Sequence, residues 1–433
     1  MDPALIGWLS IPALLLLFGL GMPVAYAMLV VGFVGYFIVA GPTRALANIS
    51  VTPYSSVAVY TLSVIPLFVL MGNLAYRAGF GQDTFWAARQ WVGRFRGGLA
   101  MATVLGCALF GAISGSSVAN AVTFGKVAVP EMRAYGYSRR LAAAAVAAAG
   151  PLAAMIPPSI LMVVYAMLTD QSVGKLLIAG YLPGFMTAGI FVVAIYLMTL
   201  RNPNLGPAVL GITWRDRISA LKGVWSILLV ALIVMAGIYT GIFTPTEAAG
   251  IGAAALLLAG VACRRLDLRG LWDALLDTAK VTGMIFAIVV GVFTFNFLIA
   301  LTRLPNRAGE FINGMGLSPI MLLIAVMILY LILGCFMDTL AMVFLTMPVI
   351  FPIIVAQGIN PIWFGILLVQ NAEIGMITPP FGITLFATKS VIPDMSVTDI
   401  AQGITPFVVA GLVSLVLLIA FPEIALFLPG LMK

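Results

Sequence analysis

The chain contains no histidine, and charged residues occupy only 9% of its 433 positions. Histidine is the commonest metal ligand in proteins and the commonest general base in enzymes, so its absence argues against most catalytic and transition-metal sites. The three cysteines, Cys107, Cys263 and Cys335, have no metal-like spacing and predict neither a zinc site nor a disulfide framework. We therefore expect a protein that is not an enzyme and that binds no organic cofactor or transition metal.

Apolar sequence is abundant instead. Hydrophobic residues fill 62% of the positions and the mean hydropathy is +1.15, whereas a soluble domain has about 25% charged residues. The apolar runs have about the 20 residues that a helix needs to cross a bilayer, and they do not alternate strictly between apolar and polar residues. The sequence predicts an all-α polytopic membrane protein. The arginines behind its net charge of +7 lie in short loops between the spans, where they set the orientation of the chain in the membrane. The charge therefore does not indicate nucleic-acid binding.

Two similar stretches place a double proline where a spanning helix should continue: GPLAAMIPPSI at residues 150–160 and AEIGMITPPFG at residues 372–382. A proline inside a helix removes one backbone donor and clashes with the carbonyl four residues earlier. Irregular backbone at membrane depth is tolerated only where it is buried in protein or lines a polar cavity. We therefore expect two broken helices, at residues 141–167 and 362–390, that mark a site. Two packing kinks are the alternative.

Two further segments predict re-entrant helical hairpins. Residues 98–130 lie between basic loops, so both ends are expected on the same side of the membrane. Their middle, GAISGSSVANA at residues 111–121, is small and polar and is expected at the hairpin tip; two ordinary spans with a serine-rich turn are the alternative. Residues 318–356 repeat the pattern, with GCFMDTLAM at residues 334–342 as the second tip.

The remaining apolar runs predict ordinary spans at residues 4–20, 23–40, 57–76, 175–200, 223–243, 246–263, 281–301 and 403–428. Two amphipathic stretches predict helices along the membrane surface. Residues 77–96 are basic and contain Phe85, Trp86 and Trp91. Residues 263–280 place Leu268 and Trp272 on an apolar face, and we expect them to form an arm that is separate from the following span.

The two halves of the chain can be laid over one another. Matching residues are separated by 222 or 223 positions: Asn73 and Asn296, Gly111 and Gly334, Pro157 and Pro379, Gly180 and Gly403, Pro183 and Pro406. Counting the spans gives the halves opposite orientations in the membrane. This pattern predicts two inverted repeats, residues 1–222 and 223–433, as in secondary transporters whose site lies between repeats.

Three motifs resemble a known family: GAISGSSVANA, IPPSILMVVYAMLTDQSVGKLLIAGYLPG at residues 156–184, and ITPPFG at residues 377–382. They are similar to the large, DctM-like membrane subunit of tripartite ATP-independent periplasmic (TRAP) transporters, over nearly the whole chain. The resemblance implies an elevator-type transporter of the ion transporter superfamily, with a small four-helix membrane subunit and a periplasmic substrate-binding protein as partners. It further implies sodium-driven uptake of an organic acid, commonly a C4-dicarboxylate or sialic acid, across a bacterial inner membrane.

The ends of interrupted helices expose carbonyls that attract Na⁺ and amides that attract anions. We expect a first sodium site built from Ser114, Ser117, Asn120, Gly150 and Met155. A second sodium site is expected from Asp338, Thr339, Gly375, Met376 and Thr378. The carboxylate of the substrate is expected near Ser116, Pro157, Pro158, Pro379 and Pro380. Tight packing of small residues is the alternative role for the serines.

Several readings stay open from the sequence. Glu373 could tune ion binding, hold a proton or bond to a neighbouring helix, and Lys126 could pair with the substrate or extend its amine to the membrane surface. A stand-alone sodium/carboxylate symporter is the main alternative function and would need no binding protein. A structural or proton-conducting subunit is a remote alternative, because the chain has few intramembrane ionisable residues.

Overall fold

The computed structural model describes residues 2–314 and 316–432, and all the regular elements in these ranges are helices. Seven of the described helices are long and apolar enough to cross a membrane, or up to nine spans if each of two bent helix pairs counts as one. This confirms the predicted all-α polytopic class. Residues 1 and 433, the outer ends of the two predicted repeats, lie outside the described residues.

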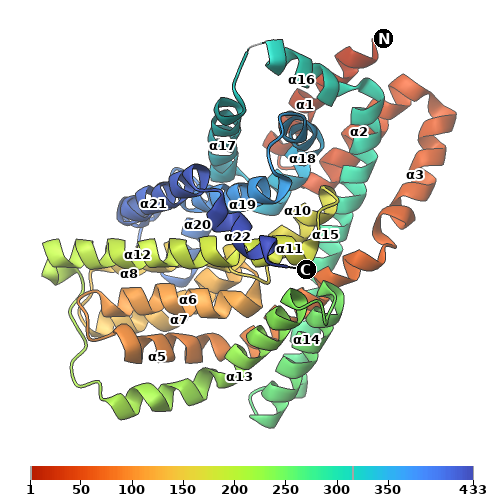
Figure 1. Cartoon of the computed structure of the whole chain (residues 1–433). Coiled ribbons are helices and arrows are strands. Elements are labelled where there is room, and N and C mark those ends of the chain that lie inside the picture. Colours follow the sequence, from red (N-terminus) through yellow and green to blue (C-terminus); the bar gives the residue numbers. More distant parts are fainter. Residues whose placement is uncertain (1, 315, 433) are drawn as a thin grey trace.

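One group of helices, shown on the right of Figure 1, forms the scaffold of the molecule. In it α2 packs along α15, α1 and α3 pack against both, and α4 packs between α14 and α15. The scaffold helices are α1 (Pro3–Gly19), α2 (Val24–Ala40), α3 (Pro42–Val57), α4 (Val64–Arg77), α14 (Pro245–Ala262) and α15 (Leu268–Thr302), with the 3-10 turn η1 (Tyr60–Ser63) before α4.

Glycines allow the scaffold helices α2 and α15 to touch at backbone level. A Cβ atom at Gly32 would lie 2.7 Å from the Cα of Phe295, and one at Gly291 would lie 2.5 Å from the carbonyl oxygen of Ala25. Both separations are shorter than real carbon contacts, so only glycine fits at these two positions. Small residues that permit such close approach are typical of helix contacts in membranes, where no hydrophobic force holds helices together.

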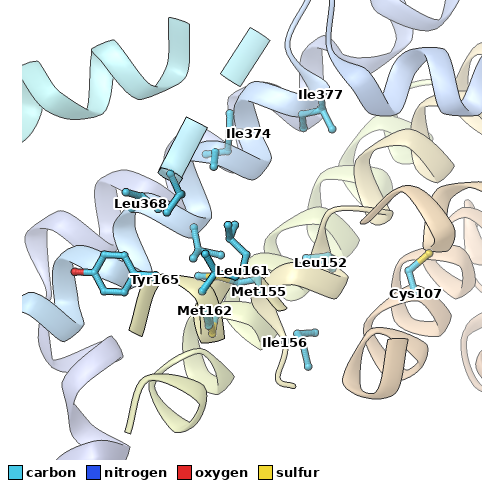
Figure 2. Close-up of a cluster of buried hydrophobic side chains, with 14 of the residues drawn as sticks. Cys107, Leu152, Met155, Ile156, Leu161, Met162, Tyr165, Leu368, Ile374 and Ile377 are labelled. Carbon is cyan, nitrogen blue, oxygen red and sulfur yellow. The ribbon is translucent and has the colours of Figure 1, made fainter. Parts of the chain in front are cut away.

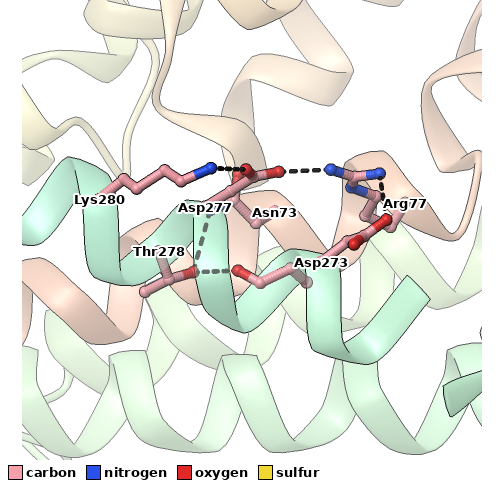
Figure 3. A network of polar contacts seen from close by, with 7 residues as sticks. Asn73, Arg77, Asp273, Asp277, Thr278 and Lys280 are labelled. Carbon is pink, nitrogen blue, oxygen red and sulfur yellow. Dashed lines mark hydrogen bonds and ion pairs between the residues drawn. The ribbon is translucent and has the colours of Figure 1, made fainter. Parts of the chain in front are cut away.

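Polar contacts join α4 to α15 inside the scaffold, as Figure 3 shows. The guanidinium of Arg77 forms ion pairs with Asp273, at 3.1 Å, and with Asp277. One turn earlier on α4, the side-chain amide of Asn73 donates to the hydroxyl of Thr278 at 3.0 Å. These contacts fix the first half of α15 against α4.

The second group holds the hairpins and broken helices, and several of its members lie side by side on the left of Figure 1. Its helices are α5 (Phe80–Val92), α6 (Gly98–Ser114), α7 (Ser117–Ala134), α8 (Arg139–Ala149), α9 (Leu152–Met155), α10 (Ile160–Leu168), α11 (Val173–Ala179), α12 (Tyr181–Arg201), α17 (Pro319–Phe336), α18 (Thr339–Ala356), α19 (Pro361–Ile377), α20 (Ile383–Val391), α21 (Val397–Ala420) and α22 (Glu423–Gly430). The 3-10 turn η2 (Pro203–Leu205), α13 (Trp214–Tyr239) and α16 (Leu304–Gly314) connect the two groups along the chain.

Both predicted hairpins are present. Helices α6 and α7 are joined by Gly115 and Ser116, and helices α17 and α18 are joined by Met337 and Asp338. Gly115 has φ +60°, a left-handed conformation that glycine adopts without strain. Ser116 and Asp338 then cap the second helix of their hairpins, because their side chains accept from the backbone amides of Ala119 and Leu340.

Both predicted broken helices are also present. The first consists of α8, α9 and α10, and its two arms are bent by 43°. The second ends its first part at Ile377 and resumes at Ile383. The Pro157–Pro158 and Pro379–Pro380 bonds are cis. The chain leaves the helical conformation completely at both double prolines, so the alternative of two packing kinks is excluded.

The predicted arm at residues 263–280 is wrong as a separate element. Residues 268–302 form one continuous helix of 35 residues, α15, that includes the predicted span at residues 281–301. No proline interrupts this sequence, so nothing forces the helix to end between arm and span. At about 1.5 Å per residue it is about 52 Å long, which exceeds a hydrocarbon core of about 30 Å and allows its polar first turns to lie outside it.

Three further differences concern amphipathic segments. The sequence reading missed α3, which is joined to α4 through η1 with a bend of 55°, and it missed α16. The predicted surface helix at residues 77–96 corresponds to α5, which is not only a surface helix. Phe80 and Phe85 are buried against neighbouring helices, while Trp86 and Trp91 are 39% and 45% exposed.

Candidate substrate and ion site

The tips of both hairpins and parts of both broken helices meet at one cavity of about 720 Å³. Its lining includes, from the first tip, Gly115, Ser116, Ser117 and Val118; from the second tip, Asp338, Thr339, Leu340 and Ala341; and from the broken helices, Ala154, Ile160, Leu161 and Met376. The opposite wall is formed by the scaffold helices α2 and α15, with Tyr26, Met284 and Ile288 among its residues. Segments more than 200 residues apart in sequence therefore share one space.

At the first tip, the structure brings together Ser117, Asn120 and Gly150 of the predicted first sodium site. The side-chain amide of Asn120 donates to the carbonyl of Cys107 at 3.0 Å and approaches that of Gly150 at 3.5 Å. A Cβ atom at Gly150 would lie 2.9 Å from the carbonyl oxygen of Ser117, so α7 and α8 are in backbone contact here. Two oxygens have no hydrogen-bond partner although they are buried: Ser114 Oγ and Asn120 Oδ1.

Met155, the fifth predicted ligand of that site, lies in a different environment. A Cβ atom at Gly180 would be 2.7 Å from the carbonyl oxygen of Met155, so this carbonyl faces the start of α12. Figure 2 shows the Met155 and Leu161 side chains in the apolar cluster between the first broken helix and α19, to which Leu368 and Ile374 contribute. This cluster holds the first broken helix against the second.

At the second tip, Asp338 and Thr339 begin α18 and line the cavity beside Met376. Gly334 and Gly375 bring α17 and α19 into backbone contact, because a Cβ atom at Gly375 would lie 2.7 Å from the Cα of Gly334. The hydroxyl of Thr378 donates to the carbonyl of Ile374 at 2.6 Å, so only its lone pairs are left for a cation. Of the predicted second sodium site, Asp338, Thr339 and Met376 thus line the cavity, whereas Gly375 and Thr378 do not.

The four prolines act on the site indirectly, because none of them is among the residues that line the cavity. A proline has no N–H, so Pro157 and Pro158 leave the carbonyls of Ala153 and Ala154 without the usual helical donor. By the same rule Pro380 deprives the carbonyl of Met376 of its donor, and this carbonyl accepts from the hydroxyl of Thr384 at 2.8 Å instead. Of the predicted substrate residues, Ser116 lines the cavity itself.

Two acidic side chains are close to this space. Asp338 lines the cavity, and Glu373 of α19 accepts a hydrogen bond of 2.9 Å from the hydroxyl of Ser117 through Oε2. Glu373 is only 5% exposed. Lys126, by contrast, is exposed and lies away from the cavity lining, which fits an amine that extends to the membrane surface.

The sequence reading missed the cavity wall on α2 and α15. Apart from Tyr26 its residues are apolar or small, and such residues on a spanning helix look the same in sequence whether they face lipid or a cavity. The glycines of the two helices, Gly32, Gly35 and Gly291, indicate close contact between α2 and α15 but do not line the cavity, so they could have predicted the helix pair and not the wall.

Residues 11–424 match the family of the tripartite ATP-independent periplasmic transporter, DctM component. The C4-dicarboxylate TRAP transporter large permease protein DctM of Pseudomonas aeruginosa is 39% identical over 373 residues, which are 86% of each chain. The sialic acid TRAP transporter large permease protein SiaM of Vibrio cholerae is 30% identical over 433 residues, which are 100% of this chain and 99% of that one.

Among solved structures, that of the Alcanivorax borkumensis YdaH transporter superposes with a TM-score of 0.59 and 15% identity, over 88% of this chain and 90% of that one. At this identity the likeness concerns the fold alone. The sequence matches are more specific, since the proteins they name are transporter permeases and not enzymes. The chain is a multi-pass membrane protein that belongs to the DctM family, and it is the large permease subunit of a TRAP transporter.

Proposed function

We propose that this subunit takes up an organic acid together with Na⁺ and that the acid binds in the cavity between the two hairpin tips. A periplasmic binding protein would deliver the acid, and a small four-helix membrane subunit would complete the complex in a bacterial inner membrane. The relatives described above are named for C4-dicarboxylates and for sialic acid, which are both carboxylic acids. We therefore take the carboxylate as the group that the cavity recognises.

The proposal rests on the convergence of two tips and two broken helices at one cavity of about 720 Å³. Helices α7 and α18 begin at this cavity, and the free amides of a helix N-terminus favour an anionic group. The first turn of α7 is thus a place for one carboxylate of the substrate, with Ser116 beside it as a further donor. At α18 the carboxylate of Asp338 already accepts from the first turn.

Charge explains why uptake of an acid here needs a cation. Asp338 lines the cavity and Glu373 lies one hydrogen bond from it, so a bound carboxylate would be a third negative group. Two like charges about 4 Å apart repel by about 4 kcal/mol even at an effective dielectric constant of about 20. Cations bound at the two predicted sodium sites would cancel this repulsion, so that substrate and Na⁺ bind together.

We further propose an elevator mechanism, in which the hairpins and broken helices move past the scaffold. The cavity lies on the boundary between the two groups, because α2 and α15 form one wall and the tips form the other. In this scheme each predicted repeat, residues 1–222 and 223–433, provides one hairpin and one broken helix to the moving group.

The test is uptake by proteoliposomes that contain this chain and its small subunit. With binding protein, labelled acid and an inward Na⁺ gradient, we expect accumulation that stops when K⁺ replaces Na⁺. Equal uptake in K⁺ would contradict sodium coupling. Uptake without any binding protein would favour a stand-alone symporter, and the absence of uptake of every acid tried would favour a structural or proton-conducting subunit.

A further inference from the structure

Glu373 is a buried carboxylate without a positive partner. It is 5% exposed, its Oε2 accepts from the Ser117 hydroxyl at 2.9 Å, and its Oε1 is buried without a hydrogen-bond partner. None of the ion pairs among the described residues includes it. An acidic group at membrane depth is expensive unless a positive charge balances it or a proton neutralises it, so the free oxygen requires an explanation.

Two other side-chain oxygens near the first tip resemble Oε1 of Glu373. Ser114 Oγ and Asn120 Oδ1 are also buried and without partners. Buried polar atoms in proteins are nearly always hydrogen-bonded, so these three oxygens, on α6, α7 and α19, would each be stabilised by a ligand. A small cation satisfies oxygens of this kind together, because hydroxyl, amide and carboxylate oxygens are all acceptors.

The hydrogen bond from Ser117 to Glu373 determines which lone pairs of the Ser117 hydroxyl are available to a cation. The hydroxyl hydrogen of Ser117 points to Glu373, so its lone pairs point elsewhere and are free for a cation. The bond joins residues 256 positions apart, one on the first hairpin and one on the second broken helix. The other acidic side chain nearby, Asp338, carries the same charge and cannot balance it.

We propose that Glu373 is the charged ligand of the first cation site, which is therefore built by both halves of the chain. The first hairpin supplies neutral oxygens from Ser114, Ser117 and Asn120, and α19 supplies the negative charge. The ligand is a small monovalent cation of the kind that drives transport, so this inference rests on the sodium coupling proposed above.

A purely structural role for Glu373 makes a different prediction. Ser117 is the first residue of α7, where free amides stabilise a nearby carboxylate. If Glu373 only stabilised this helix end, its replacement would lower the stability of the protein by the same amount in Na⁺ and in K⁺. A ligand role predicts that the loss appears as weaker Na⁺ binding.

The experiment measures thermal unfolding of the purified subunit in NaCl, with KCl keeping the ionic strength constant. A cation that binds the folded state raises the Tm, and the concentration dependence gives the half-saturating Na⁺. We expect Glu373→Gln to raise this concentration about tenfold or more, a change of about 1.4 kcal/mol. Glu423→Gln, which changes an exposed glutamate on α22, should leave it as in the unmodified chain.

Glu373→Asp keeps the charge and withdraws the carboxylate by one methylene, so it should raise the half-saturating Na⁺ less than Glu373→Gln does. It also provides the test if the glutamine variant fails to fold, because an unchanged half-saturating Na⁺ in Glu373→Asp would overturn the proposal. Sodium binding by Glu373→Gln within twofold of the unmodified chain would overturn it as well. If the unmodified chain itself does not respond to Na⁺, the sodium-coupled function fails, and that result is distinct from a failure of the Glu373 assignment.

Discussion

The two broken helices have similar sequences but very different surroundings. At the first break, every residue from 151 to 159 is buried, and Ser159 caps α10 by accepting from the amide of Met162. At the second break, Pro380 is exposed and Phe381 is 51% exposed. The ring of Phe381 contacts that of Phe336 at the second tip, with centroids 5.2 Å apart, and Phe336 is 60% exposed.

The covering helices explain this difference. In the first half, α6 is buried along most of its length because α5, α7, α8 and α12 pack around it. In the second half, α17 leaves one face open along its whole length, formed by Ile320, Ile324, Ile328, Ile332 and Phe336. The comparison teaches that a double proline causes a break locally, whereas the neighbouring helices decide whether the break is fixed in a core or free to rearrange.

The largest expected effect comes from removing an apolar side chain at the buried break. Ile156 is fully buried, so Ile156→Ala should leave a cavity and lower the stability by about 2–5 kcal/mol. Phe381→Ala, at the exposed break, should cost less than about 1 kcal/mol, because a side chain that faces lipid or water leaves no cavity. Thermal unfolding in detergent measures both. Equal losses would show that the two breaks are equally packed.

A second prediction concerns the glycine in each hairpin. A Cβ atom at Gly111 would lie 2.8 Å from the Cα of Ala153, and one at Gly334 would lie 3.0 Å from the Cα of Gly375. We expect Gly111→Ala to cost about 1–3 kcal/mol, because α6 is surrounded and cannot move away. Gly334→Ala should cost less, since α17 can shift toward its open face. A larger loss for Gly334→Ala would contradict this reading.

A third prediction tests the charge at the second tip. Asp338→Asn removes the charge but keeps a good helix cap, so α18 should still begin at the same place. We expect the half-saturating Na⁺ for uptake to rise about tenfold, a change of about 1.4 kcal/mol. Thr213→Ala, which removes a cap of α13 far from the cavity, is the control for effects of capping alone. Unchanged sodium activation in Asp338→Asn proteoliposomes would exclude Asp338 from the ion site.

The smallest effect is expected where the halves meet outside the membrane spans. Arg133, at the end of α7, forms an ion pair of 2.8 Å with Asp394, in the loop before α21, and this lowers the pKa of the Asp394 carboxyl. A lowered pKa stabilises the folded state above the usual pKa of aspartate, and the contribution is lost as the pH falls through the lowered value. Asp394→Asn should slightly reduce the Tm at neutral pH and should not at the most acid pH tested. An identical reduction at both values would mean that the pair is not responsible.

The sequence predicted those parts of the fold that depend on local chemistry. The prolines at 157–158 and 379–380 were enough to locate both broken helices, because the effect of proline on a helix needs no distant partner. The small polar residues Ser114, Ser116 and Ser117 located the first hairpin. The continuity of α15 could not be predicted from the sequence. An amphipathic stretch before an apolar span can be a separate helix or the first turns of the same helix, and the surroundings of the stretch decide which of the two forms.

The lining of the cavity was predictable in part for the same reason. Ser116, Ser117 and Asp338 were recognisable as polar residues at tips, and the structure places them at the cavity or beside it. The bond between Ser117 and Glu373 joins distant segments and depends on how α7 and α19 pack, which the local sequence does not encode. The cavity wall on α2 and α15 could not be predicted from the sequence for the same reason.

The direct backbone contact of α2 with α15 at Gly32 and Gly291 has a consequence for the cavity wall that these two helices share. Where no side chains separate two helices, no rotamers between them can rearrange, so their spacing is fixed. The side chains that they present to the cavity, Tyr26 from α2 and Met284 and Ile288 from α15, are therefore carried on one rigid pair of helices. A compound that contacts Tyr26 and Met284 together would bind two helices that cannot shift relative to one another.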